Sequence, residues 1–211
     1  MKINKIVLLF SVVVFTFFIA RSQENAKKDL NTMAIKMFEK TNERDFDALL
    51  DMTYPKVYDL VPKETMKNLF VSMFEGTDEM SINLPNLTPK YILSDIYSDE
   101  DSNTEYAFLT YDMSMSMTFK QQDFDKDGKQ MMIKMFKVQG MDASFETDNK
   151  INILAPNRMV VFLKNESSNK EWKMINYDSN SPIFVDMLSV GILEKAGKYY
   201  QNILLEAKKR N

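Results

Sequence analysis

The sequence predicts an α+β domain in which three N-terminal helices close the concave face of a strongly curved antiparallel sheet, followed by a C-terminal helical tail. Three observations support this fold class. Apolar residues follow the period of a helix up to Gly76, then recur at every second residue, and return to helical spacing from about residue 182. Helices that precede a run of strands are typical of an α+β arrangement. Because no long linker interrupts residues 23–211, we expect one domain.

The first helix should run from Glu24 to about Arg44, since its apolar residues recur on one helix face. A short second helix should follow the capping carboxylate of Asp45. It should end at Tyr54, because the residue before a proline is pushed out of the α region. A third helix is expected between a proline and a glycine, which are residue types that begin and end helices: Pro62 and Gly76.

The clearest strand covers residues 107–119, where apolar side chains alternate and three methionines share one face. We expect it to be half-buried, with its odd-numbered face from Leu109 to Phe119 opposite the helices. The segment Ala155-Pro156-Asn157 predicts a turn. Further strands are expected at residues 91–97, 131–138, 150–154, 158–164 and 171–177.

The N-terminus has the parts of a secretory signal peptide: a basic start, an apolar stretch and a small-x-small sequence that ends at Ser22. The apolar stretch from Ile6 to Ile19 has 14 residues. A membrane-spanning helix needs roughly 20, so cleavage after Ser22 is favoured over a retained anchor. We therefore expect residues 1–22 to be removed from an exported protein, periplasmic or extracellular, with no stable membrane insertion after cleavage.

Charge and composition exclude several classes of function. Cleavage removes three basic residues and no acidic one, so the 27 basic and 30 acidic residues become 24 and 30, a net charge of −6. This balance argues against nucleic acid as a partner, because phosphate binding needs a net basic face. The chain has no histidine and no cysteine, which removes the usual neutral-pH base, the thiolate nucleophile and the Cys/His zinc site. We expect no cofactor and no metal.

Two segments suggest a metal, and we favour a structural interpretation for each. The thioethers of Met113, Met115 and Met117 are soft ligands that suit copper(I). Alternate residues of a strand are about 6.6 Å apart, too far for sulfurs that share one ion unless the side chains converge. Residues 123–128 match the start of an EF-hand calcium loop, but Lys134 stands where that loop needs glutamate. We therefore interpret Asp127-Gly128 as a hairpin turn.

The segment from Phe38 to Met52, in which a turn ending in Asp45 separates two helices, resembles the opening of the nuclear transport factor 2-like (SnoaL-like) superfamily. The strand around Trp172 is similar to the closing strand of that family. The segment Thr53 to Val57, followed by a helix that begins with proline, resembles a group of exported, functionally uncharacterised bacterial members. The resemblance covers roughly residues 28–178 and implies a cone-shaped sheet with an apolar pocket on its concave side.

The resemblance implies a cavity and not a reaction, because members include isomerases, dehydratases and cyclases as well as binding and dimerisation domains. Ketosteroid-isomerase-like members use a tyrosine on the first helix and an aspartate base. Here Met37 stands at the first position and Pro55-Lys56 near the second, and the histidine used by dehydratases is absent. An isomerase or lyase therefore stays as an alternative that needs a poised carboxylate elsewhere in the cone.

The leading hypothesis is a non-enzymatic domain that binds a small apolar ligand or a protein partner in a pocket lined by methionine and aromatic side chains. A further alternative is a dimerisation module that uses the outer sheet face or the tail helix, with Tyr199 and Tyr200. We name no catalytic residue. The residues predicted to line the pocket are Met37, Tyr54, Phe70, Met73, Tyr111, Met113, Met115 and Trp172.

Overall fold

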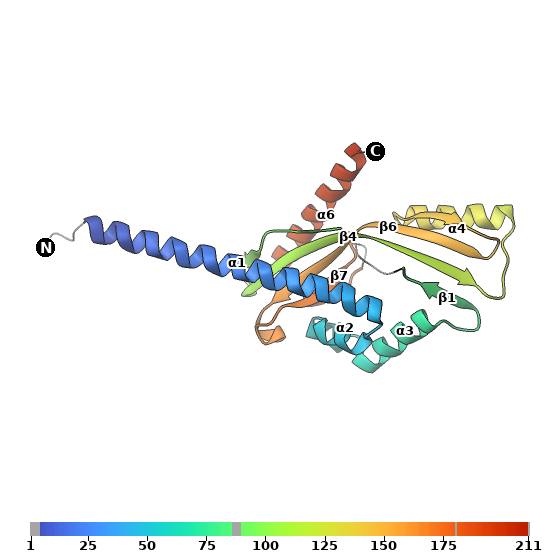
Figure 1. Cartoon of the computed structure of the whole chain (residues 1–211), viewed down its shortest axis with the longest axis horizontal. Helices are drawn as coiled ribbons and strands as arrows, with labels where there is room; N and C mark the ends of the chain where they lie inside the picture. The colour runs from blue at the N-terminus through green and yellow to red at the C-terminus, as the bar shows by residue number, and fades with distance from the viewer. Residues whose placement is uncertain (1–4, 86–89, 180, 211) are drawn as a thin grey trace.

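The computed structural model describes the backbone of residues 5–85, 90–179 and 181–210, and the side chains of this range from residue 24 to 209. Helices lie at both ends of the chain with an antiparallel sheet between them, which confirms the α+β class (Figure 1). The predicted signal peptide, residues 1–22, lies outside the range of described side chains. In the described part of the chain, no helix is long and apolar enough to cross a membrane.

Three helices form in the N-terminal part as predicted, except that the first begins at Lys5 and not at the predicted Glu24. Helix α1 (Lys5–Glu43) ends before Arg44, which has a positive φ of 57°. Helix α2 (Phe46–Met52) is capped by Asp45, whose carboxylate accepts a hydrogen bond from a backbone N–H of the first turn. After a short 3-10 helix, η1 (Pro55–Asp59), helix α3 (Lys63–Glu75) fills the predicted interval between proline and glycine.

The sheet is built around two long antiparallel strands, β4 (Thr104–Phe119) and β6 (Lys150–Lys164). Three short strands pair with the outer edge of β4: β1 (Met80–Asn83), β2 (Tyr91–Leu93) and β3 (Tyr97–Asp99). Two more pair with β6: β5 (Asp142–Phe145) and β7 (Lys173–Tyr177). The prediction of one strand over residues 91–97 is therefore wrong, because β2 and β3 are separate.

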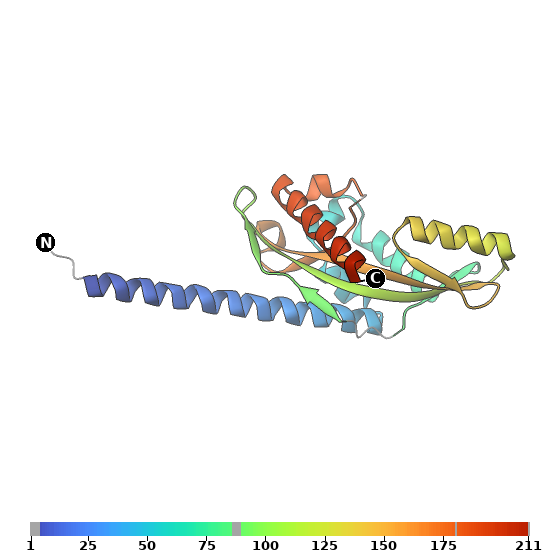
Figure 2. The same ribbon diagram turned by 90° about the horizontal axis from the view of Figure 1, so that it is seen from above.

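The predicted strong curvature is also wrong: the sheet is an open ribbon that is not strongly curled (Figure 2). A cone needs several long strands side by side, whereas the short strands here lie end to end along β4 or β6. One irregularity interrupts the long pair, between Tyr111 and Met113 on β4. A single bulge bends and twists a strand locally but does not close a sheet.

That bulge explains why the turn predicted at residues 155–157 is wrong. Tyr111 pairs with Arg158, and Met113 pairs with Ala155, so β6 has one residue more than β4 in this interval. Asn157 takes a positive φ of 54°, and its N–H donates a hydrogen bond to the carboxylate of Asp112 at 2.8 Å. The two strands predicted on either side of the turn are one continuous strand.

The hairpin turn at Asp127-Gly128 and the strand at 131–138 are wrong as well, because both belong to helix α4 (Lys126–Val138). Asp125 caps this helix: its Oδ1 accepts a hydrogen bond from the N–H of Gly128 at 2.8 Å. Asp127-Gly128 therefore lies in the first turn of a helix that Asp125 caps, not in a hairpin. Helix α4 packs beside β5 at the end of the ribbon, where Lys129 Nζ lies 5.6 Å from the ring centre of Phe145.

Helices cover both faces of the first half of β4, so the prediction of a half-buried strand is wrong there, whereas the second half, from Tyr111 on, is only partly buried. On one face α1 packs against Ala107 and Leu109. On the other face helices α5 (Phe184–Met187) and α6 (Val190–Arg210) pack against Phe108, whose ring centre lies 4.7 Å from that of Tyr199. Figure 2 shows α1 and α6 on opposite sides of the sheet. The tail helix therefore covers the outer sheet face within its own chain.

Candidate functional site

A cavity of about 180 Å³ lies between helices α1 to α3 and the sheet, on the face that α1 covers. Its wall combines residues from the three helices with residues of β4 and β7. Nine of the lining side chains are apolar, four are polar, and none is ionised at neutral pH. The lining residues are Met37, Phe38, Thr41, Phe46, Leu49, Thr53, Phe70, Phe74, Leu84, Tyr111, Met113, Met174 and Asn176.

Aromatic contacts hold the walls of this cavity in place. The ring of Phe46 lies 5.9 Å from that of Phe70 and 5.3 Å from that of Phe74, which joins α2 to α3. Phe38 of α1 meets Tyr111 of β4 edge to face at 5.1 Å. Contacts of this type favour a preformed cavity, because the rings are large and have few rotatable bonds.

The polar groups of the wall are few and differ in how they are satisfied. The hydroxyls of Thr41 and Thr53 donate to backbone carbonyls of their own helices, at 2.7 and 3.0 Å. The hydroxyl of Tyr111 has no hydrogen bond to any described residue. Burial raises the pKa of Tyr111, and the positive charge of Arg158 opposes part of this increase. Tyr111 is therefore a protonated hydroxyl that can donate to a ligand at neutral pH.

The electrostatics of the described residues do not indicate a poised acid or base at this cavity. Each carboxylate whose pKa is displaced has a pKa below its ordinary value, because hydrogen bonds stabilise the charged form. These residues are Asp45, Asp51, Asp99 and Glu146, and none of them lines the cavity. Among the described residues there is also no group of three or more acidic side chains that could hold a metal ion.

Four of the eight residues predicted to line a pocket do line this cavity: Met37, Phe70, Tyr111 and Met113. Trp172 packs against the core cluster between α1 and the sheet without lining the cavity. Lys164 Nζ lies 5.6 Å from the ring centre of Trp172.

The other three predicted residues lie elsewhere. Met73 is on α3 with 43% of its surface exposed. Met115 lines a shallow depression of about 420 Å³ on the sheet near β5. The expectation that the whole odd-numbered face of β4 opposes the N-terminal helices is thus wrong beyond Met113. Tyr54 belongs to the core cluster under α5 and α6.

Tyr54 is held in a second, more polar region, a cleft of about 300 Å³ beside α5 and α6. The side-chain amide of Asn165 donates to the hydroxyls of Tyr54 and Thr104, both at 3.0 Å. The amide oxygen of Asn165 accepts from the N–H of Ser168 at 3.2 Å. These bonds satisfy hydroxyls that are almost fully buried, which indicates a structural role for the cluster.

Several cavity residues were missed by the sequence analysis. Phe74 follows Phe70 by one helical turn, so the period of α3 could have identified it. Leu84 and Asn176 reach the cavity only through the order and register of the strands, which a single sequence does not specify. Arg158 lies beside the cavity without lining it and was missed for the same reason, since only the register of the long strands pairs it with Tyr111.

The fold and the cavity define an α+β domain with a small apolar internal site. The chain matches no model of a known protein family, no curated protein and no solved structure. The nuclear transport factor 2-like resemblance therefore stays an interpretation of residues 28–178.

Proposed function

We propose that this chain is an exported, non-enzymatic domain of the nuclear transport factor 2-like type, and that it binds a small apolar ligand between helices α1 to α3 and the sheet. The observation that carries the proposal is the cavity of about 180 Å³, with its mostly apolar wall and one unpartnered hydroxyl. Binding sites for small molecules are typically apolar hollows with a few placed polar groups. The wall of this cavity fits that description.

The volume restricts the ligand. An apolar cavity of about 150 Å³ is enough to hold benzene, whereas sites for drug-sized molecules have roughly 300 to 1,000 Å³. A cavity of about 180 Å³ therefore suits a single ring or a short alkyl chain and is too small for a steroid. The thioethers of Met37, Met113 and Met174 in the wall are flexible and would adapt to either shape.

Neither alternative has comparable support. An isomerase or lyase needs a carboxylate or another base in the cavity, and the lining contains none. A dimerisation module would use the outer sheet face with Tyr199 and Tyr200, but both side chains pack against the α5 and α6 core cluster of their own chain. Other apolar side chains of the tail are exposed, among them Leu204 and Leu205 near the end of α6.

Fluorine NMR of fluorobenzene with the mature chain, residues 23–211, tests the proposal. We expect saturable binding that Met113→Trp abolishes, because the larger ring fills part of the cavity. Met115→Trp is the matched control, since it places the same ring on the same strand outside the cavity. Circular dichroism confirms that both variants fold. Absence of saturable binding to the unmodified chain, or equal loss in both variants, would overturn the proposal.

The exported state has its own test. Mass spectrometry of the protein recovered outside the cytoplasm of its host should give a chain that begins at Gln23. A chain that retains residues 1–22 in the membrane fraction would contradict cleavage.

A further inference from the structure

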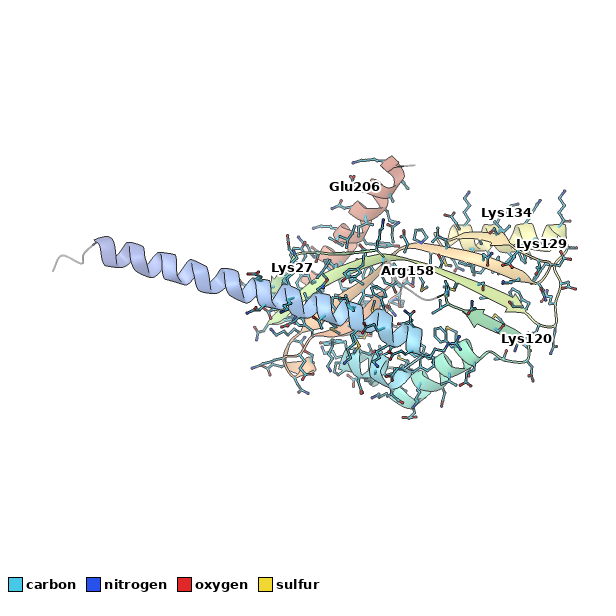
Figure 3. The ribbon with its side chains drawn as sticks, viewed as in Figure 1. Lys27, Lys120, Lys129, Lys134, Arg158 and Glu206 are labelled. Carbon is cyan, nitrogen blue, oxygen red and sulfur yellow. The ribbon has the colours of Figure 1, made fainter. Side chains whose placement is uncertain are left out.

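Arg158 lies beside the cavity, and its positive charge has no partner among the described residues. It pairs directly with Tyr111 in the register of β4 and β6, and directly opposed residues of an antiparallel pair point to the same face. Its side chain is half-buried. Among the described residues, its guanidinium makes no ion pair and no hydrogen bond. Figure 3 labels Arg158 at the middle of the ribbon.

The guanidinium of Arg158 is open to a ligand. No described side chain has a buried nitrogen or oxygen without a hydrogen-bond partner, so the unpaired nitrogens of this guanidinium are accessible from solvent. The lysines of this chain contrast with it, since many of them pair with carboxylates on the surface, as Lys164 does with Glu105 at 2.7 Å. Asp112, which follows Tyr111 on β4, is no partner for Arg158. Asp112 alternates with Tyr111 on β4, so its carboxylate points to the opposite face, where it accepts the N–H of Asn157.

We propose that the ligand of the cavity is a small carboxylic acid, with its ring or alkyl part in the cavity and its carboxylate bound by the guanidinium of Arg158 and the hydroxyl of Tyr111. This inference rests on the proposed function and specifies the ligand class. A guanidinium binds a carboxylate through two parallel N–H donors. The hydroxyl of Tyr111 has a free proton to donate, and the apolar wall supplies the contacts to the uncharged part.

The geometry also explains the arrangement of polar groups around the cavity. The threonine hydroxyls donate to their own helices, so Tyr111 is the side chain of the cavity wall on β4 that has a donor to spare. Arg158 does not itself line the cavity but stands next to Tyr111, where a head group would emerge. A neutral ligand of the same size would leave the charge of Arg158 unpaired, and a cationic ligand would be repelled by it.

Isothermal titration of the mature chain with three ligands that share one ring tests this inference: benzoate, benzyl alcohol and benzylamine. We expect benzoate to bind roughly tenfold or more tightly than benzyl alcohol, because hydrogen bonds between charged groups are the strong ones. Benzylamine should bind most weakly. Higher salt should weaken benzoate and leave benzyl alcohol unchanged.

Two variants and a control assign the effect to residues. Arg158→Gln should reduce benzoate affinity roughly tenfold without changing benzyl alcohol, and Tyr111→Phe should reduce it by a smaller factor. Lys134→Gln on α4 is the charge-matched control, exposed and distant from the cavity, and should change neither (Figure 3). If Arg158→Gln fails to fold, the ligand comparison on the unmodified chain and Tyr111→Phe still decide.

The possible results distinguish a failure of the carboxylate inference from a failure of the proposed function. If fluorobenzene and benzyl alcohol bind but benzoate binds no more tightly, the carboxylate inference is overturned and the apolar site stands. Unchanged benzoate affinity in folded Arg158→Gln overturns it in the same way. If none of the ring ligands binds, the proposed function fails first.

Discussion

Alanine at Gly191, in the first turn of α6, should not stabilise the domain, although the position is exposed and helical. A Cβ at this position would lie 2.6 Å from Oδ1 of Asp99, closer than any carbon normally approaches an oxygen. Asp99 therefore has to move. Its carboxylate accepts hydrogen bonds from Ser102 and, at 2.9 Å, from Ser189, which also caps α6 through the N–H of Ile192.

The size of the effect follows from two opposing contributions. Each lost hydrogen bond to a charged group costs about 1.5 to 3 kcal/mol when no solvent replaces it. Because water can reach the partly exposed carboxylate of Asp99, we expect a total loss of about 1 to 2 kcal/mol. Alanine in place of glycine gains about 0.5 to 1 kcal/mol in a helix. The free energy of unfolding should thus fall by about 0 to 1.5 kcal/mol in Gly191→Ala.

Gly197 of the same helix provides the matched control. Its added Cβ would meet the hydroxyl of Tyr177 at 3.7 Å, an ordinary contact, so Gly197→Ala should raise the free energy of unfolding by about 0.5 to 1 kcal/mol. Urea denaturation followed by circular dichroism measures both. In an Asp99→Ala background Gly191→Ala should also stabilise. Equal stabilisation by both alanines in the unmodified background would refute the packing of Asp99 against α6.

Two further predictions concern the same polar region. Hydrogen bonds, from Ser102 first, hold the pKa of Asp99 below its ordinary value of 3.8. The contribution of Asp99 to the free energy of unfolding is therefore complete at neutral pH, and it is lost as the pH falls below 3.8 through the lower pKa of the folded state. Asp99→Asn should make the free energy of unfolding, measured by urea denaturation, depend less on pH in this acidic range. Asn165→Asp keeps an oxygen that can accept from the N–H of Ser168, but a carboxylate replaces the NH2 group that donates to the buried hydroxyls of Tyr54 and Thr104. This variant should lower the free energy of unfolding by about 1 to 3 kcal/mol in urea denaturation, whereas a shift within error would show that the cluster is not structural.

The sequence was most informative where structure depends on neighbours along the chain. The ends of α2 and α3 follow from the capping carboxylate of Asp45 and from the residues Pro62 and Gly76. The cavity residues Met37 and Phe70 follow from the periodicity of their helices. These features depend on interactions within a few residues, which a single sequence contains.

The sequence-based predictions fail where the local structure depends on contacts with segments that are distant in the chain. The helix α4 was interpreted as a strand, because Met, Ile and Phe suit either element and the Asp-Gly pair before them suits a turn. Tyr54 was placed in the pocket, but its hydrogen bond to Asn165, 111 residues away, holds it on the opposite side of the sheet. The curvature of the sheet depends on how many long strands lie side by side, and no local pattern specifies that number.

The extra residue of β6 at the bulge determines which side chains of this strand point to each face of the sheet. Deletion of Asn157 therefore tests the fold directly. On the face that α1 covers, the buried residues of β6 that follow Asn157 are even-numbered, as in Val160 and Phe162. Those that precede Asn157 are odd-numbered, because Ile153 and Ile151 pair with Met115 and Met117 on that same face of β4. Without the extra residue, regular alternation would turn these isoleucines to the other face.

Deletion of Asn157 should therefore expose Ile151 and Ile153, which are now 0% and 3% exposed. Full exposure of two such side chains costs about 1.5 to 3 kcal/mol each, a large share of the roughly 5 to 15 kcal/mol that stabilises a typical domain. Asn157→Gly is the control: it keeps the residue count, permits the positive φ of 54° and retains the N–H that bonds Asp112. We expect the deletion to lose several kcal/mol in urea while Asn157→Gly stays near the unmodified chain. Equal stability of the deletion would mean that the two long strands pair without a bulge.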